Sequence, residues 1–346
     1  MTPKRWILAV LSFAASIGAS AYIVYTTWPQ QRNPAILPLW AHGAALLLAL
    51  LEMGSRALKI HFSAAALRVP LGFGATLRTC LGGDFGGAIT PGRSGAEPAR
   101  YLILSEAGVP PAENFLILWI ELFLEMLSLA AVVVAFGILF QGSAGGALAG
   151  VLGVVGIYAL FVLGLAAAGI VLSRRNASGP PPAWASALWL HAGRWRAIQR
   201  SLRRIRAGVE RARDAKLGLL ALAYLASILH VLFRLAILPL LVFALGGLTG
   251  SIAPLVLWPL ALFYGGVVAP VPGGGGFIEV TFRHFLGDAI PAFVLGASLI
   301  WWRFYTFYLY VILGAIAAGR SVMRALRDDG EEMGEEGATP AAEGAA

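Results

Sequence analysis

The chain has 346 residues, of which 58% are apolar and only 13% are charged. Soluble domains carry about 25% charged residues, so this composition excludes an ordinary soluble protein and predicts an integral membrane protein. The net charge is +8, and the single cysteine, Cys80, excludes a disulfide framework and a paired-cysteine metal site.

Apolar segments long enough to cross a bilayer recur along the chain, since about 20 apolar residues span its hydrocarbon core. The predicted full spans cover residues 6–28, 37–57, 114–140, 147–172, 217–245 and 289–319. They indicate an all-α integral membrane fold with about six full transmembrane helices. The predicted membrane domain covers residues 1–327. The acidic tail, residues 328–346, has no apolar periodicity, and we expect it to be disordered.

Residues 173–216 account for the net positive charge of the chain, with eleven arginine and lysine residues against two acidic ones. Such a run can bind nucleic acid, but this segment joins two predicted spans, and cytoplasmic loops are enriched in Arg and Lys. Tryptophans among the arginines favour an amphipathic loop on the inner leaflet. We therefore expect no nucleic-acid partner, and we place both termini in the cytoplasm.

Two glycine-rich segments interrupt the apolar pattern and resemble each other. Residues 82–100 read GGDFGGAITPGRSGAEPAR, and residues 265–283 read GGVVAPVPGGGGFIEVTFR. Irregular backbone at membrane depth must be enclosed by protein or line a wet cavity. Paired broken segments in the two halves of a chain are typical of inverted repeats around a transport site. With both termini in the cytoplasm, the count of membrane crossings makes the first segment enter and leave on the cytoplasmic side and the second on the outer side. We therefore predict two opposed, glycine-broken re-entrant helical hairpins in an inverted repeat.

Each broken segment is expected to restart as a half-helix, whose free N–H groups favour an anion. In the first segment, Ser94 to Glu97 fits an S-x-x-E capping box. In the second, four glycines precede a half-helix over residues 277–286 and permit close approach of a bound group. An alternative is that the glycines only allow close packing and the glutamates only cap helices.

These segments supply the predicted binding site for an anionic head group, with arginines and glycines around each half-helix. The predicted substrate-binding residues are Pro91, Gly92, Arg93, Gly95, Glu97, Arg100, Pro272, Gly273, Gly274, Gly275, Gly276, Glu279 and Arg283.

Four further charges fall within predicted spans, namely Glu121, Glu125, Arg234 and Arg303. A charge at the bilayer centre costs at least about 2.5–3.5 kcal/mol, so such residues pair with one another or line a pathway. Pairing of the two glutamates with Arg234 or Arg303 and a direct role in binding both stay open. The histidines show no metal-ligand spacing and are expected to pack in the core or at the interface. We expect no metal and no cofactor.

The two broken segments carry a resemblance to a known family. PVPGGGGFIEV (residues 270–280) resembles the P-G-G-x-G-x-x-E signature of the lysylphosphatidylglycerol synthetase transmembrane-region family, also called the flippase-like domain family. PGRSGAEPARYLIL (residues 91–104) is similar to its P-x-R-x-G-E-x-x-R-like motif, with Ala96 as an extra residue. The resemblance covers about residues 5–320 and carries over the motif prolines, glycines, glutamates and arginines named above.

This resemblance implies a multi-spanning protein that moves amphiphilic lipids between leaflets, with residues 1–327 as the flippase-like domain. The bifunctional members append a soluble aminoacyl-transferase domain. No such domain follows in these 346 residues, so we do not expect lysyl-lipid synthesis.

The leading hypothesis is therefore a lipid flippase or transporter that moves an anionic amphiphilic lipid between leaflets of the inner membrane. One alternative is an integral-membrane enzyme acting on a lipid head group, with Glu97 or Glu279 as general base. Another is an accessory subunit in cell-envelope biogenesis. The expected partners are membrane lipids with anionic head groups, and a homo-oligomer or a cell-envelope enzyme partner stays open.

Overall fold

The computed structural model describes residues 36–141, 145–174, 215–265, 272–274 and 276–321, with single residues within 14–26 and 195–210. Its regular elements in these ranges are all helical. Most of the first predicted span, most of the basic loop, Gly275 and the acidic tail lie outside the described residues, so the predictions made for them stay predictions.

The helices follow the apolar segments of the sequence. They are α2 (Leu39–Ala66), α3 (Phe73–Ala88), α4 (Ala96–Glu106), α5 (Pro111–Leu139), α6 (Gly145–Arg174), α9 (Leu217–Ala244), α10 (Ala253–Gly265), α11 (Phe277–Leu286) and α12 (Ala292–Arg303). The helix that begins with α12 continues through a π-helical turn, Phe304–Tyr308, to Ser321. Two short 3₁₀ turns complete the order, η1 (Pro91–Arg93) and η3 (Pro272–Gly274).

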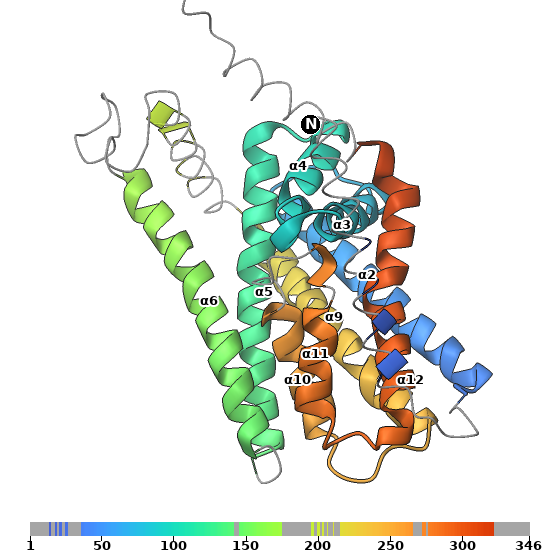
Figure 1. Ribbon diagram of the computed structural model, residues 1–346. Helices are drawn as coiled ribbons and strands as arrows, with labels where there is room; N and C mark the ends of the chain where they lie inside the picture. Colours follow the sequence, from blue (N-terminus) through green and yellow to red (C-terminus); the bar gives the residue numbers. More distant parts are fainter. Residues whose placement is uncertain are drawn as a thin grey trace, which may run out of the picture.

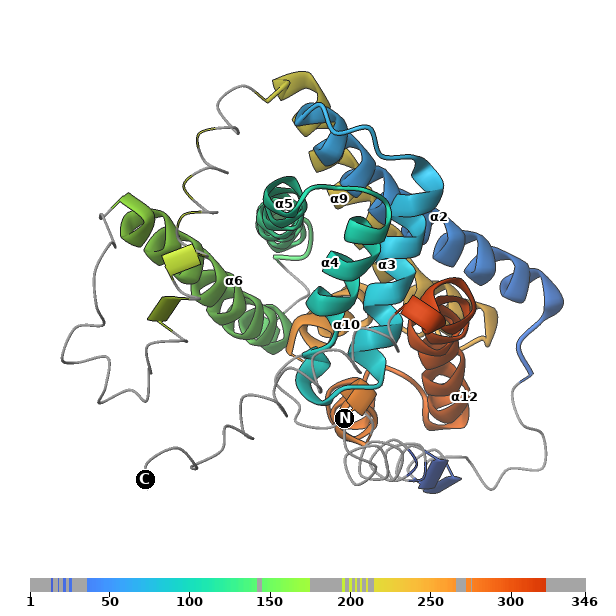
Figure 2. The same ribbon diagram turned by 90° about the horizontal axis from the view of Figure 1, so that it is seen from above.

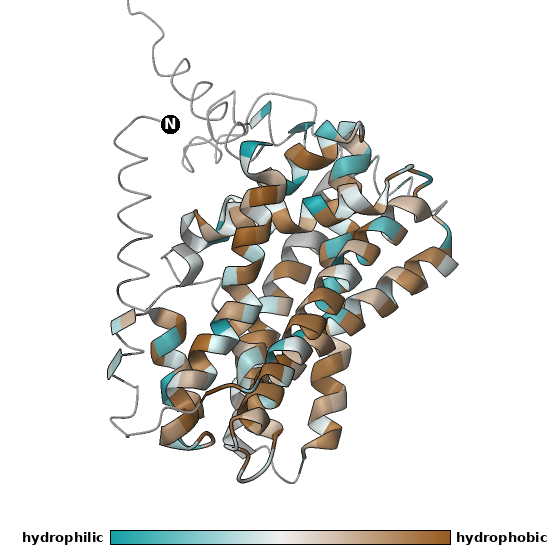
Figure 3. Cartoon of the chain, turned by 90° about the vertical axis from the view of Figure 1, so that its right-hand side faces the viewer, coloured by the Kyte–Doolittle hydropathy of each residue, from teal (hydrophilic) through white to brown (hydrophobic). Residues whose placement is uncertain are grey.

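Within the described ranges, three helices are long and apolar enough to cross a membrane: Pro111–Leu139, Leu217–Ala244 and Ala292–Ser321. The segments Ala149–Gly164 and Ala253–Tyr264 are shorter apolar helices. Helix α2 has 28 residues, but three of its side chains are charged: Glu52, Arg56 and Lys59. Figure 3 shows that apolar residues dominate the helices, with hydrophilic ones scattered among them. The chain is thus a helical membrane protein, and the count of about six spans stays a prediction.

The long helices enclose two shorter helix pairs. In Figure 1, α5 and α6 run along one side of the molecule and the helix of α12 along the other. Helix α2 packs against α9. Helices α3 and α4 pack together in the upper half of this view, and α10 and α11 in the lower half. Figure 2 shows α3 and α4 in the middle, between α5 on one side and α2 and α12 on the other.

The turns that join these helix pairs contact each other and have the same backbone conformation. Gly92 in η1 and Gly273 in η3 have φ angles of 58° and 64°. The residues that follow, Arg93 and Gly274, have φ angles of 56° and 66°. A proline precedes each pair in the sequence. The likeness between the two broken segments therefore extends from the sequence to the backbone of their turns.

Two expectations about helix ends were wrong. Helix α2 runs to Ala66 and not to residue 57, and Arg56 and Lys59, near the expected end, are buried inside the protein. The S-x-x-E capping box does not form, because α4 begins after Gly95 without a side-chain cap. The Gly95 N–H instead donates to Thr90 Oγ1 at 2.8 Å. Helix α11 has the predicted bounds, and the Glu279 carboxylate accepts from the Gly276 N–H at 2.7 Å.

Glycines on α3 allow α4 to approach closely, as small residues do at helix contacts in membranes. A Cβ added at Gly86 would lie 2.6 Å from the Gly95 carbonyl oxygen and 2.9 Å from Ala99 Cβ. A Cβ added at Gly82 would lie within contact distance of Ile103. Close packing, one of the two roles considered for these glycines, therefore applies to this face of α3.

Gly86→Ala is expected to lower the free energy of unfolding by about 1–3 kcal/mol, because the added methyl group overpacks the contact with α4. The control is Gly74→Ala in the same helix, where a Cβ would meet nothing within 4 Å. It should leave stability unchanged or raise it by about 0.5–1 kcal/mol, since Ala is the better helix former. Thermal unfolding of both variants in detergent tests this, and equal stability would contradict the packing role.

Candidate functional site

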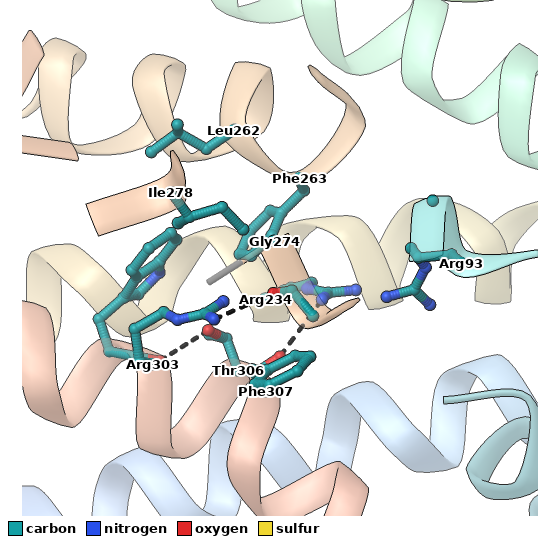
Figure 4. Close-up of a pocket in the computed structure, with 12 residues that line it drawn as sticks. Arg93, Arg234, Leu262, Phe263, Gly274, Ile278, Arg303, Thr306 and Phe307 are labelled. Atoms are coloured by element: carbon teal, nitrogen blue, oxygen red, sulfur yellow. Dashed lines mark hydrogen bonds between the residues drawn. The ribbon is translucent and has the colours of Figure 1, made fainter. Parts of the chain in front are cut away.

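A cavity of about 40 Å³ lies where the two turns meet. Its described lining comes from η1, η3, α9, α10, α11 and the helix of α12, and Figure 4 shows most of these side chains. The lining residues are Gly92, Arg93, Arg234, Leu262, Phe263, Gly273, Gly274, Ile278, Trp302, Arg303, Thr306 and Phe307. The space is enough for a few water molecules, since one water needs about 10–15 Å³.

Arg303 connects α12 to the second turn. Its Nε lies 2.9 Å from Glu279 Oε1, and its Nη2 donates to the Gly273 carbonyl oxygen at 3.1 Å. Its guanidinium also lies over the Phe307 ring, 4.4 Å from the centroid. Glu279 accepts the Gly276 N–H with its other oxygen. One buried carboxylate thus caps α11 and orients the arginine toward the cavity.

Arg234 reaches the same cavity from α9. Its Nη2 donates to the Thr306 carbonyl oxygen at 3.3 Å, and the guanidinium lies over the Phe263 ring, 4.1 Å from the centroid. Its Nη1 is 3.8 Å from Glu52 Oε1 in α2. Stacking on an aromatic ring attracts the cation and holds the guanidinium plane in place. Arg234 is therefore positioned by three helices besides its own, α2, α10 and α12.

Arg93 is the lining arginine with the most open side chain, of which 35% is exposed. Its Nη2 is 3.5 Å from Asp84 Oδ1. With a φ angle of 56° it occupies the left-handed region, where the matching position of the second turn has Gly274. An L-residue other than glycine pays about 1–2 kcal/mol there. Such strain concentrates at functional sites, so Arg93 is a strong candidate for direct contact with a ligand.

Two of the lining arginines, Arg93 and Arg234, contact carboxylates that belong to a buried ion cluster. Arg56 contacts both carboxylate oxygens of Asp84, at 3.1 and 2.5 Å, and its Nε is 3.1 Å from Glu52. All three side chains are buried. The sequence analysis did not identify this cluster, since the charges that it placed within predicted spans do not include Glu52, Arg56 or Asp84. The spacing of Glu52, Arg56 and Lys59 on one helix face was the signal that could have found it.

Glu121 belongs to a second ion cluster. It pairs with Lys59 Nζ at 3.1 Å and accepts from Arg100 Nη1 at 2.8 Å. Arg100 also lies 3.3 Å from Glu97, whose side chain is 64% exposed. Neither Arg100 nor Glu97 is among the described residues that line the cavity.

Glu125 joins the two clusters through a histidine. It pairs with Lys59 and accepts from the Tyr264 hydroxyl at 2.7 Å. His230 lies between two carboxylates, with Nε2 2.8 Å from Glu125 and Nδ1 3.7 Å from Glu52. This histidine was expected only to pack. The two glutamates of α5 therefore pair with Lys59, Arg100 and His230, and not with the two arginines that the sequence left open.

The remaining predicted binding residues that the structure describes lie in the turns or in the segments that follow them. Gly95 is packed against Gly86, and Arg283 is exposed in the last turn of α11. Pro91 and Pro272 begin η1 and η3. The structure thus brings Gly92, Arg93, Gly273 and Gly274 together with Arg234 and Arg303 around one cavity. Within the described ranges, no group of His, Cys, Asp and Glu is arranged to hold a metal ion.

Lys59→Met is expected to lower the free energy of unfolding by about 3–5 kcal/mol, because it leaves two buried carboxylates without their shared cation. The double variant with Glu125→Gln should recover part of this loss, because it removes one of these negative charges. Thermal unfolding in detergent measures both effects. A Lys59→Met protein as stable as the wild type would show that the cluster does not contribute to stability.

Arg93→Gly is expected to be about 1 kcal/mol more stable than Arg93→Ala, because only glycine adopts the left-handed conformation without strain. Both variants remove the same guanidinium, so their difference isolates the backbone. The comparison is made by unfolding the two proteins side by side. Equal stability would mean that position 93 is not strained.

Comparison with known proteins agrees with the motifs in these turns. The family described as the lysylphosphatidylglycerol synthase TM region matches residues 6–314, a range that contains both turns and every residue named above as lining the cavity. A UPF0104 membrane protein from Archaeoglobus fulgidus is 26% identical over 286 residues, which cover 78% of this chain and 82% of the archaeal protein. The chain therefore belongs to the lysylphosphatidylglycerol synthase TM region family.

Proposed function

We propose that this protein moves an anionic amphiphilic lipid between the leaflets of its membrane, with the lipid head group held in the cavity between η1 and η3. One observation carries the proposal. Three arginines from different elements, Arg93, Arg234 and Arg303, line this cavity, and no carboxylate is among its described lining residues. Guanidinium groups bind phosphate oxygens through paired, charge-assisted hydrogen bonds, which are strongest away from water.

The arrangement of the two helix pairs supports a transport mechanism. In the proposal, α3 with α4 and α10 with α11 are opposed re-entrant hairpins that enter from the two faces of the membrane and meet at mid-depth. Their turns contact each other, and the cavity between them is small, so this conformation corresponds to the occluded state. Opening one hairpin at a time would expose the arginines to one leaflet and then to the other, while the lipid tails stay in the bilayer.

The buried carboxylates pair with the arginines and hold them in orientation during this movement. Each lining arginine contacts a carboxylate that is not among the described lining residues: Asp84 for Arg93, Glu52 for Arg234 and Glu279 for Arg303. Because a charge inside a membrane is costly unless it is paired, these contacts allow three cations to share a small space. The head group would then complete the neutralisation from the cavity side.

The enzyme alternative has less support in this geometry. Glu279 has one oxygen engaged by Arg303 and the other by the Gly276 N–H, and it does not line the cavity. Glu97 is paired with Arg100 and also lies outside the described lining. Neither is placed to accept a proton from a head group held by the arginines.

The location of the protein follows from the same hypothesis. We propose a multi-pass protein of the bacterial inner membrane with both termini and the basic loop, residues 173–216, on the cytoplasmic side. Its partners would be membrane lipids with anionic head groups. A homo-oligomer or a cell-envelope enzyme partner is compatible with this arrangement.

Purified protein in liposomes is expected to move acyl-labelled phosphatidylglycerol between leaflets, as measured by dithionite bleaching of the exposed label. Arg234→Gln and Arg93→Gly should slow the movement by about tenfold or more, since a hydrogen bond to a charged group contributes about 1.5–3 kcal/mol. Arg320→Gln is the control, because Arg320 is exposed near the end of its helix and lies outside the described cavity lining.

The folded state of each variant is checked by its thermal unfolding, so that loss of movement is not confused with loss of protein. Absence of lipid movement by folded wild-type protein would contradict the proposal. Normal movement by both cavity variants would remove the arginines from the transport site.

A further inference from the structure

The described wall of the cavity presents cations and glycine backbone among apolar side chains. Besides the three arginines and the two glycine turns, its described lining consists of apolar or aromatic side chains and Thr306. No aspartate or glutamate is among these lining residues. The neighbouring residues 266–271 and 275, which the structure does not describe, contain no acidic residue in the sequence. The chain segment between α10 and α11 therefore cannot add a carboxylate to this wall.

The carboxylates that contact the lining arginines are already paired with protein groups. Glu279 is 1% exposed, and both of its oxygens contact protein groups. Asp84 is held at both oxygens by Arg56. Glu52 is fully buried beside Arg56 and His230. A positively charged ligand group in the cavity would thus meet guanidinium groups and no counter-ion from these residues.

Some N–H donors of the lining arginines have no acceptor among the described residues and can bind an anion. The Nε atom of Arg234 is buried and has no hydrogen-bond acceptor among the described residues. Arg93 directs a partly exposed guanidinium into the same space from the opposite hairpin. A phosphate group can accept several hydrogen bonds at once, and a planar guanidinium can donate two of them in parallel.

From these contacts, and resting on the function proposed above, we infer that the site takes a compact phosphate head group without an amine, such as a phosphomonoester or a glycerol phosphodiester. The same wall selects against aminoacylated head groups. Lysylphosphatidylglycerol, the lipid in the family's description, carries ammonium groups beside its phosphate. In this cavity those ammonium groups would face the arginines, and like charges brought together in an interface oppose binding.

Binding to the purified wild-type protein in detergent tests the inference directly. The probes are dihexanoylphosphatidylglycerol and its lysyl ester, which share the same phosphate and the same tails. Their dissociation constants are measured from the rise in unfolding temperature with concentration. Phosphatidylglycerol is expected to bind at least about tenfold more tightly, a modest difference for the charge contrast involved. Equal binding, or tighter binding of the lysyl ester, would overturn the inference.

A carboxylate added to the wall should change the preference. Ile278 lines the cavity on α11, near Phe263 and Gly274 (Figure 4). Ile278→Glu is expected to reduce the preference for phosphatidylglycerol over its lysyl ester by about tenfold, whereas Ile278→Gln, with the same shape and no charge, should retain it. A preference that stays the same in the glutamate variant, or changes equally in both, would count against the inference. If Ile278→Glu does not fold, the wild-type comparison decides.

Transport of the same two head groups separates this inference from the function on which it rests. Acyl-labelled phosphatidylglycerol and its lysyl ester are compared in liposomes that contain the wild-type protein. Faster movement of phosphatidylglycerol supports both statements. Equal movement keeps the transport function and overturns the head-group selectivity. If neither lipid moves but phosphatidylglycerol still binds more tightly, the transport function fails and the ligand class holds.

Discussion

The pairing of charges that are withdrawn from water is the constraint on which this structure depends. Arg56 and Lys59 in α2, Asp84 in α3 and Glu121 in α5 are all buried, and each is paired with a residue of another helix. An unpaired charge at such depth would be costly, so the helices must adopt the arrangement in which the pairs form. The apolar surfaces of membrane helices specify little by themselves, because lipid tails are equally apolar. The ion pairs therefore give the helix arrangement much of its specificity.

The two glycine turns are held together by this arrangement of helices. They share a backbone conformation but differ in one side chain. Gly92 and Gly273 share one backbone conformation, as do Arg93 and Gly274. The first turn puts an arginine at the second of these positions despite the strained φ angle, and the second turn puts a glycine there. Arg303 donates to the carbonyl oxygen of the neighbouring Gly273. The cavity thus receives one cation from the first turn itself, Arg93, and one from α12, Arg303, which is bound to the second turn.

The chemistry of the cavity comes as much from the placement of its carboxylates as from its arginines. Acidic residues are close enough to pair with the cations but are not among the described lining residues, as with Glu279 beside Arg303. This geometry stabilises a cluster of positive charge and leaves its open side for an anion. A carboxylate on the cavity side would have satisfied the same arginines and closed the site to phosphate. The orientation of each pair, and not its presence alone, decides what the site can bind.

The sequence by itself determined the membrane class, the helical character, the two glycine-broken segments and the family, because these follow from composition, periodicity and local motifs. It also predicted the bounds of α11, since the glycines before Phe277 and the glycine after Leu286 mark both ends locally. The partners of the buried charges were decided only by the tertiary structure. Lys59 meets Glu125 and Arg234 meets Glu52 through contacts between helices that are far apart in sequence.

The sequence analysis placed Arg100 at the predicted site because it follows the first turn. In the structure, the packing of α4 on α5 instead pairs Arg100 with Glu121. Arg234 and Arg303 are distant from both turns in sequence, yet the packing of α9 and α12 brings them to the cavity. Spacing along one helix reveals which residues share a face, but not which helix that face meets. That choice depends on the mutual satisfaction of all the buried charges, which only the folded chain provides.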